Sequence, residues 1–395
     1  MTNITPGLVK KLITDASGKL FVPETITNAI GSCVFSDVDV VEQKGDWLKT
    51  LYDSYQTKME PMSVDYSGDG TMDAYSVYYL PRNTLVPKVA ILCCAYHPAF
   101  QQLPNILRVL DLGSGTGGVI LGLLDLFQNK ALSGTRLHII AVDSSLQALT
   151  RQRLLVEKIG LNSSSLEQHQ VDLSDSRSYQ SKLLVGAPYD MVFAANILTE
   201  LEPDKGDALF EHIASLLSDN GVIISVEAQR NYVMRQRVRM AKNAQQVSLH
   251  IYYPCPPNVV CSQSRCWMWR KDEFECPHIM VKGNPVESTN IQIAHWMILC
   301  TKACSIYDVL CNHNPELIWA VAAPYRPKFE GDKVKHGYEF CTEKGRYTGT
   351  ITQDQEKWMW LMRDELFDRG SVIGITADLK EIPEGWDIVS GFVSY

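Results

Sequence analysis

The sequence predicts an α/β fold built on a doubly wound, mostly parallel sheet. Short apolar runs alternate with helix-length segments between residues 107 and 226, and a glycine-rich turn follows the first of these runs. Acidic or amide side chains also stand where several of the runs end. Strands that alternate with helices of this length pair in parallel and carry helices on both faces. Ligands of such sheets bind at the carboxyl ends of the strands.

The first predicted strand, Leu107–Leu112, carries Asp111 near its end. The run Gly113-Ser114-Gly115-Thr116-Gly117-Gly118 follows at once and opens a predicted helix from Val119 to Phe127. Glycine lets the chain turn tightly and lets a ligand approach the backbone, because no Cβ stands in the way. Strand, glycine turn and helix in this order are typical of nucleotide-binding βαβ units.

A second strand is expected at Arg136–Val142, and Asp143 follows it directly. This carboxylate stands 26 positions beyond Gly117, about where such folds hold the hydroxyls of a ribose. A helix is expected at Ser145–Ile159. Three further strands are expected along the chain: Gln170–Leu173, which contains Asp172; Tyr189–Ala194, which leads to Asn196; and Val222–Val226, which ends at Glu227.

The composition is that of an ordinary globular protein, with 45% hydrophobic and 21% charged residues. The formal net charge of −8 argues against a protein that coats nucleic acid, although a local basic patch remains compatible with it. No apolar run is long enough for a membrane-spanning helix, and the first residues lack a secretory signal. Eleven cysteines without such a signal indicate a reducing compartment, either the cytoplasm or the mitochondrial matrix.

We divide the chain into four parts: a helical N-terminal cap (1–72), a nucleotide-binding domain (73–253), a cysteine-rich insertion (254–290) and C-terminal strands with a small α+β appendage (291–395). The apolar and aromatic segment Asp73–Phe100 is expected to form one or two helices. Interruptions are expected near Pro81 and Pro87, because proline disrupts the interior of a helix.

The glycine-rich sequence DLGSGTGG resembles the first motif of class I methyltransferases, and the VDSS and VDL steps resemble their second and third motifs. The resemblance implies a Rossmann-like, seven-stranded-type sheet and S-adenosylmethionine as cofactor, with NAD or a ligand-free relic as alternatives. It implies that Asp143 holds the ribose and that Asp172 lies near the adenine, although a surface loop remains an alternative for Asp172. The candidate cofactor-binding residues are Asp111, Gly113, Ser114, Gly115, Gly117, Asp143, Asp172 and Asn196. No residue is assigned as catalytic.

A second group of chemically informative residues follows Glu227. Residues 228–271 contain no Asp or Glu and eight basic residues, for which a solvated helix face is the simpler interpretation. Within this basic run, Cys255, Cys261 and Cys266 have the spacing C-x5-C-x4-C, and prolines flank the first of them. Such spacing suits a metal or cluster site. Scattered core thiols are the alternative.

The chain also resembles the methyltransferase-like proteins of the mitochondrial ribosomal small subunit and their bacterial relatives. The matching pieces are AYSVYYLPRN, VLDLGSGTGG, NILTEL, VEAQRN with the basic helix and YPCPPNVVC after it, RCWMW and FCTEKG. The resemblance implies a [4Fe–4S] cluster held by Cys255, Cys261, Cys266 and Cys341. Zinc is the alternative to the cluster, and Cys276 is the alternative fourth ligand.

Three functions remain open on these grounds. In the first, the protein acts on the small ribosomal subunit as a methyltransferase, and the basic run 228–271 contacts ribosomal RNA. In the second, it methylates a small molecule or peptide and has a structural four-cysteine site. In the third, it is an assembly factor that binds the cofactor without catalysis. The order of the matching motifs favours the ribosome, whereas the acidic net charge favours the small acceptor.

Overall fold

The computed structural model describes most of the chain, and from residue 313 onward it describes the course of the backbone. The described residues are 2–35, 69–97, 100–128, 131–160, 165–197, 200–228, 231–255, 270–286, 291–313, 317–324, 328–330, 333–342, 345–354, 372–376, 379–382, 385–388 and 392–394. None of the helices in these ranges combines the length and apolar character that crossing a membrane requires.

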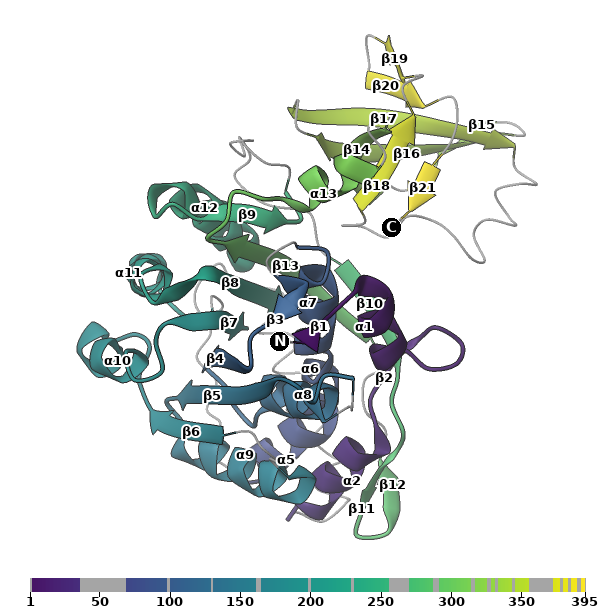
Figure 1. Ribbon diagram of the computed structural model, residues 1–395. Helices are drawn as coiled ribbons and strands as arrows, with labels where there is room; N and C mark the ends of the chain where they lie inside the picture. Colours follow the sequence, from purple (N-terminus) through teal and green to yellow (C-terminus); the bar gives the residue numbers. More distant parts are fainter. Residues whose placement is uncertain are drawn as a thin grey trace.

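A nine-stranded sheet forms the centre of the molecule (Figure 1). Its strand order is β2-β10-β13-β8-β7-β4-β5-β6, with β9 also paired to β13. The five strands from β8 to β6 are parallel, and β13 runs antiparallel to β8. The strands are β2 (Leu20–Phe21), β4 (Ile106–Leu112), β5 (Arg136–Asp143), β6 (Ser165–Gln170), β7 (Tyr189–Ala195), β8 (Leu217–Ala228), β9 (His250–Tyr253), β10 (Arg270–Glu275) and β13 (Ile291–Cys300).

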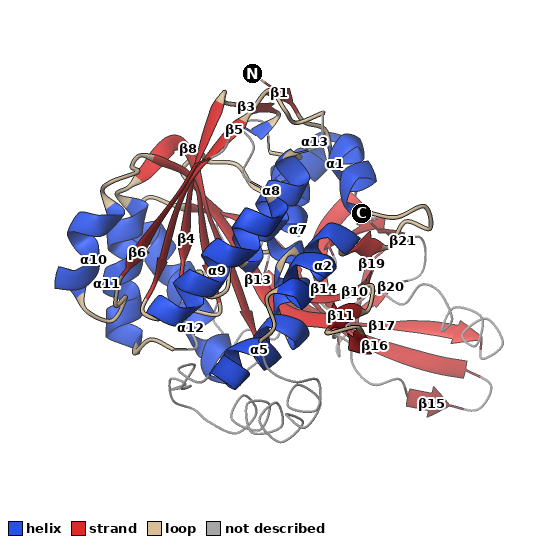
Figure 2. Cartoon of the chain, turned by 90° about the horizontal axis from the view of Figure 1, so that it is seen from below, coloured by secondary structure: helices blue, strands red, loops and turns tan. Residues whose placement is uncertain are grey.

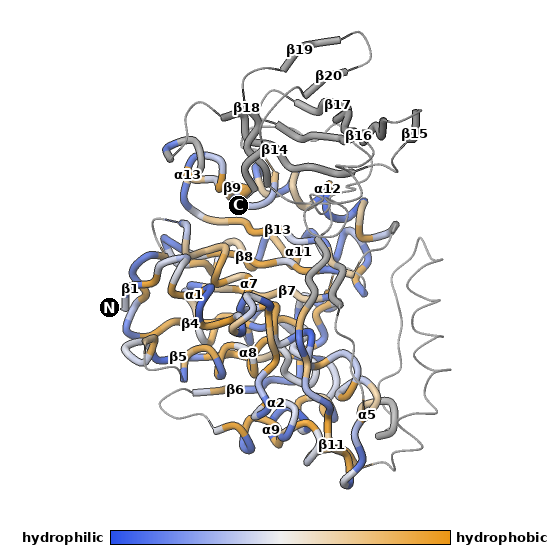
Figure 3. Tube along the Cα trace, turned by 90° about the vertical axis from the view of Figure 1, so that its right-hand side faces the viewer, coloured by the Kyte–Doolittle hydropathy of each residue, from blue (hydrophilic) through white to orange (hydrophobic). Residues whose placement is uncertain are grey.

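Helices cover both faces of this sheet (Figure 2), as the predicted doubly wound fold requires. Each face has its own apolar core, because alternate side chains of a strand point to opposite faces. The apolar strands run through the middle of the molecule in Figure 3. One core packs against α1 (Pro6–Ile13), α2 (Glu24–Ser32), α5 (Asp69–Tyr78), α6 (Leu80–Asn83), α7 (Leu85–Cys94), α8 (Gly118–Phe127) and α9 (Leu146–Ile159). The other packs against α10 (Ser176–Leu183), α11 (Pro203–Ala214) and α12 (Asn231–Gln246).

The third strand lies earlier than the sequence predicted. Strand β6 covers Ser165–Gln170, so the expected strand Gln170–Leu173 is wrong except for its first residue. β6 is an edge strand that pairs only with β5 among the described strands, and its side chains are mostly exposed or half-buried. It therefore needs few apolar residues, whereas the buried Val171 and Leu173 that follow it mimic a strand pattern.

The segment before β4 contains three helices, α5, α6 and α7, rather than one or two. Pro81 stands in the first turn of α6, next to the break at Tyr79, as expected. The break expected near Pro87 falls three residues earlier, at Thr84 between α6 and α7. α7 begins at Leu85, so Pro87 is its third residue, where the missing N–H would have no partner within the helix.

Strand β13 carries two separate strands on one of its edges. β9 pairs with Ile298–Cys300 and β10 pairs with Ile291–Ala294, both antiparallel to β13. The domain boundary predicted at residue 291 assigned β13 to the C-terminal part. The pairing of β13 with β8, however, makes β13 a strand of the central sheet. The N-terminal part is tied to the same sheet, since β2 pairs with β10.

The C-terminal part forms a second, mostly antiparallel sheet, which lies beyond β9 and α12 in Figure 1. Its described elements are α13 (Ile306–His313), β14 (Leu317–Pro324), β15 (Lys328–Glu330), β16 (Lys333–Thr342), β17 (Gly345–Asp354), β18 (Val372–Thr376), β19 (Leu379–Ile382), β20 (Gly385–Ile388) and β21 (Phe392–Ser394). Two small pairs complete the description: β1 (Thr2–Asn3) with β3 (Gln102–Leu103), and β11 (Ile279–Val281) with β12 (Asn284–Val286).

Candidate functional site

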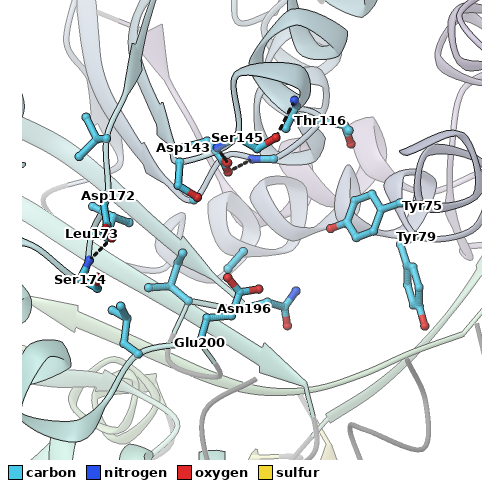
Figure 4. A pocket seen from close by; sticks show the side chains of 18 of the residues that line it. Tyr75, Tyr79, Thr116, Asp143, Ser145, Asp172, Leu173, Ser174, Asn196 and Glu200 are labelled. Atoms are coloured by element: carbon cyan, nitrogen blue, oxygen red, sulfur yellow. Dashed lines mark hydrogen bonds between the residues drawn. The ribbon is translucent and has the colours of Figure 1, made fainter. Parts of the chain in front are cut away.

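A cavity of about 370 Å³ opens at the carboxyl ends of β4, β5 and β7. This is the edge at which parallel sheets bind ligands, because the loops that leave the strands meet there. Figure 4 shows Asp172 and Leu173 on one side of the cavity and Tyr75 and Tyr79 on the other. The lining comes from the glycine loop, the end of β5, residues 171–174, residues 195–197 and 200–201, and the helices α5 and α6.

The glycine loop forms the floor of the cavity between β4 and α8. Gly113, Gly115 and Gly117 have φ values of +60°, +51° and +94°, a region that side chains with a Cβ rarely adopt. A Cβ on Gly113 would lie 2.0 Å from the Cδ1 atom of Ile197. At Gly115 the nearest atom to such a Cβ is 4.0 Å away, so a side chain there would project into open space beside the cavity.

Two of the predicted loop residues lie behind the floor rather than in the lining. The Ser114 hydroxyl accepts a hydrogen bond of 3.0 Å from Gln152 Nε2 on α9. A Cβ on Gly117 would lie 2.8 Å from Cγ of the same glutamine. Ser114 and Gly117 therefore hold the loop against α9, whereas Gly113 and Gly115 face the cavity.

Asp143, the last residue of β5, lines the cavity and anchors two loops. Its Oδ2 accepts the Gly115 N–H at 2.8 Å, and its Oδ1 accepts the Ser145 N–H at 2.8 Å. Burial raises the pKa of this carboxyl, and the two backbone donors oppose that rise because they stabilise the charged form. Each carboxylate oxygen can accept more than one hydrogen bond, so both have capacity for a further donor.

Asp111 lies inside the sheet, beneath the glycine loop. Its side chain is 1% exposed, and its Oδ2 has no hydrogen-bond partner among the described residues. Burial, and then the nearby charge of Asp143, raise the pKa of Asp111 well above its ordinary value. Burial and the neighbouring carboxylate thus both disfavour the charged form of this side chain.

Asp172 stands in an exposed turn after β6, where its Oδ1 accepts the Ser174 N–H at 2.8 Å. The surface-loop interpretation thus describes its setting, yet the residue also lines the cavity. The apolar side chains of Val171, Leu173 and Ala148 line the same side. A flat aromatic ring would find hydrophobic walls there.

Asn196 lines the opposite wall, just after β7. Its backbone adopts a positive φ of 61°, which asparagine tolerates better than most residues. Its N–H donates to the Val226 carbonyl at 2.8 Å, and its Oδ1 accepts the Ala228 N–H at 3.1 Å. These bonds fix the end of β7 to the end of β8.

The sequence did not identify Tyr75, Tyr79, Arg82 and Glu200, which also line the cavity. The Tyr75 hydroxyl points into the cavity (Figure 4) and accepts a hydrogen bond of 3.1 Å from Asn83 Nδ2. Burial raises the pKa of Tyr75 to about 12, so it stays protonated at neutral pH. The sequence signal that could have identified Tyr75 and Tyr79 was the cluster of aromatic residues in AYSVYYLPRN.

The predicted metal site lies only partly within the described chain. Cys255 is half-buried after β9, Cys276 is half-buried after β10, and Cys341 is the penultimate residue of β16. Cys261 and Cys266 lie outside the described residues. Within the ranges that the structure describes, no three His, Cys, Asp or Glu side chains are placed to hold a metal ion. The four-cysteine ligand set therefore stays a prediction.

The basic run is partly used inside the fold. Arg237 on α12 is buried and donates to the Trp296 carbonyl oxygen. Arg239 pairs with Asp204 at 2.7 Å and with Asp207. Arg235 and Lys242 lie on the same helix, and both side chains are exposed. Two of the residues expected to contact phosphate thus already have partners within the protein.

Residues 110–223 match the family model described as "Methyltransferase domain". No curated protein matches the sequence. The chain is similar in fold to magnesium protoporphyrin IX methyltransferase from Synechocystis with bound S-adenosylmethionine, at 14% identity and a TM-score of 0.36, covering 68% of this chain and 99% of that one. It is also similar to an O-methyltransferase family protein from Burkholderia thailandensis, at 11% identity and a TM-score of 0.39, covering 68% and 71%.

The family model and the order of the strands around the cavity together indicate the kind of domain that the chain contains. The order β6-β5-β4-β7-β8-β13, with β13 antiparallel, is the mostly parallel sheet that the sequence predicted. The matched residues begin within β4 and end within β8, and they include the glycine loop, Asp143, Asp172 and Asn196. Residues 110–223 therefore form a methyltransferase domain with the α/β fold that the sequence predicted.

Proposed function

We propose that the protein binds S-adenosylmethionine in this cavity and transfers its methyl group to an acceptor that enters beside Asn196. The observation that carries the proposal is the glycine loop fixed to Asp143 at the edge of the cavity. When bound, S-adenosylmethionine supplies an electrophilic methyl group on a sulfonium centre. The residues of the protein then have to hold, orient and desolvate the reactants.

The residues present fit this cofactor at three places. Asp143 has the capacity to accept ribose hydroxyls in addition to its two backbone donors. Val171, Leu173 and Ala148 offer apolar surface for an adenine ring. The lack of Cβ atoms at Gly113 and Gly115 lets a ligand lie against the backbone.

Calorimetry with S-adenosylhomocysteine, the product form of the cofactor, tests the proposal directly. We expect one site per chain in the wild type and no measurable site in Gly115→Arg. Binding of unchanged affinity to Gly115→Arg would contradict the placement of the site. Product formation with a candidate acceptor then distinguishes an active enzyme from an assembly factor that binds the cofactor without catalysis.

We further propose that Cys255, Cys261, Cys266 and Cys341 hold a [4Fe–4S] cluster. The C-x5-C-x4-C spacing supports it. The connection that contains Cys255, Cys261 and Cys266 also begins and ends beside β13, because Tyr253 before it and Arg270 after it both pair with that strand. Iron, sulfide and zinc should be measured on protein purified without oxygen. About four irons and four sulfides, lost in Cys255→Ser, are expected for the cluster. One zinc per chain would instead favour the structural site.

For the partner, we propose the small ribosomal subunit. The order of the matching motifs supports this choice, and Arg235 and Lys242 supply positive charge on α12. Affinity for small-subunit RNA should fall steeply as the salt concentration rises. Replacing Arg235 and Lys242 together by Gln should weaken the binding of this RNA. An affinity that changes neither with the salt concentration nor in the double variant would contradict this interface.

Methylation of a small molecule or peptide is the second candidate. The net charge of −8 favours it, and so does the engagement of Arg237 and Arg239 within the fold. An acceptor of this kind requires no RNA. Methyl transfer to a small acceptor in nuclease-treated protein, without binding to ribosomal RNA, would support this candidate over the ribosomal one.

A further inference from the structure

Arg82 brings a positive charge into the cavity and has no counter-ion among the described residues. In the described lining it carries the only positive charge, whereas Asp143, Asp172 and Glu200 carry acidic groups. Its Nε is buried and has no hydrogen-bond partner in the described part of the chain, and no ion pair joins Arg82 to those residues. A buried guanidinium donor without an acceptor is costly, which points to an acceptor that arrives with a ligand.

The guanidinium is held in position by its neighbours. It stacks on the Tyr79 ring, with Cζ 4.2 Å from the ring centre. The next residue, Asn83, donates to the Tyr75 hydroxyl at 3.1 Å. Tyr79 itself is only 6% exposed. Stacking orients the planar fork of donors, so less conformational freedom is lost when an anion binds.

Two glycines on α8 bring this arrangement close to the glycine loop. A Cβ on Gly118 would lie 2.5 Å from the Asn83 Cβ, and a Cβ on Gly122 would lie 2.0 Å from the Thr84 carbonyl oxygen. The end of α6 therefore packs directly against the backbone of α8, the helix that the glycine loop opens. The position of Arg82 relative to the loop is set by this close contact.

We propose that Arg82 binds the carboxylate of the cofactor's amino-acid end and thereby selects the complete cofactor over fragments that lack this group. The inference rests on the proposed cofactor site. The apolar side chain of Leu173 lies at one end of the cavity, Asp143 lies in between, and Tyr75 lies at the other end (Figure 4). An adenine-to-ribose-to-amino-acid order along this path brings the carboxylate to α6. Arg forms charge-assisted, often bidentate bonds with a carboxylate.

The matched probes are S-adenosylhomocysteine and its decarboxylated analogue, which differ only in the carboxylate. In wild-type protein, calorimetry should give an affinity about 10- to 100-fold higher for S-adenosylhomocysteine, the usual range for a charge-assisted hydrogen bond. Arg82→Met should remove this preference by weakening only the binding of S-adenosylhomocysteine. Arg82→Lys should keep part of the preference. Arg136→Met, which removes an exposed arginine at the far end of β5, is the control and should bind both probes as the wild type does.

Three results would overturn the inference. Equal weakening of both probes in Arg82→Met would make Arg82 a residue that supports only the shape of the cavity. A preference that persists in Arg82→Met, together with a raised KM for the acceptor, would assign Arg82 to a carboxylate of the acceptor instead. If neither probe bound the wild type, the proposed cofactor site itself would fail, an outcome distinct from the other two.

Discussion

The Gly115 N–H donates to the Oδ2 atom of Asp143 at 2.8 Å, which ties the glycine loop to the end of the neighbouring strand. The other oxygen of the same carboxylate accepts the Ser145 N–H at the start of α9. One side chain therefore fixes both loops that flank the proposed ribose position. Its role in shaping the site and its proposed role in binding a ribose are therefore coupled.

Asp143→Asn should weaken binding of S-adenosylhomocysteine by about 10- to 100-fold, measured by calorimetry. The amide keeps the shape of the side chain, but its NH2 group faces one of two backbone donors and cannot accept from it. The same mismatch should lower the free energy of unfolding by about 1–3 kcal/mol, measured by urea denaturation.

Asp175→Asn is the matched control for this change. Asp175 caps α10 and accepts the Arg177 N–H at 3.1 Å, but it lies outside the cavity. Asparagine caps helices about as well as aspartate. Cofactor affinity should therefore stay at the wild-type value. An Asp143→Asn protein that binds as well as this control would contradict a ribose-binding role for Asp143.

Gly115→Arg should abolish cofactor binding while the protein remains folded. The new side chain would occupy the space beside the loop, where the nearest atom to a Cβ at this position is 4.0 Å away. Gly18→Arg is the control, since Gly18 also has a positive φ of +83° and open surroundings but lies outside the cavity. Both variants carry backbone strain of about 1–2 kcal/mol, so only a difference in calorimetric binding between them reports on the site.

Gly122→Ala should lower both stability and cofactor affinity. Its Cβ would lie 2.0 Å from the Thr84 carbonyl oxygen, so α6 must move away from α8. Overpacking of this kind costs about 1–3 kcal/mol. The same substitution at Gly7 in α1, where no atom lies within 4 Å of the new Cβ, should leave cofactor affinity unchanged. Thermal denaturation and calorimetry on both variants measure the two effects, and unchanged affinity in Gly122→Ala would contradict the coupling between α6 and the site.

His97 should make the protein sensitive to acid. The side chain is 2% exposed between Phe100 and Tyr252, and burial lowers its pKa to about 4. The unfolded chain binds a proton below about pH 6.5, whereas the native state does so only near pH 4. Stability that is present above about pH 6.5 is therefore lost as the pH falls toward 4, by on the order of 3 kcal/mol. His97→Phe should flatten the dependence of unfolding free energy on pH in this window. A slope equal to that of the wild type would refute this explanation.

The central βαβ elements could be predicted because their signals are local. The structure has strands and helices at β4, α8, β5 and α9 within a residue or so of their expected limits, and Ser145 caps α9 through its hydroxyl. A strand between two others is buried on both faces over most of its length, so its apolar run is nearly continuous and its pattern is clear. β6 at the edge has no such requirement, and its position was wrong.

The far side of the site could not be predicted in the same way. Arg82 reaches the cavity because α6 packs against Gly118 and Gly122, a contact between segments about 40 residues apart in the chain. Local periodicity contains no information about which loop a short helix will face. Gly113, Gly115, Asp143 and Asn196, in contrast, follow directly from strand ends, so the rule for parallel sheets located them.

The edge of β13 anchors both ends of the connection that contains Cys255, Cys261 and Cys266. Since β9 and β10 pair with the same strand, the residues between them begin and end on a frame that is already hydrogen-bonded. Changes in that connection are expected to leave these strand pairings in place. The surface beside this edge can therefore differ in chemistry while the cavity, whose lining comes from other elements, keeps its shape.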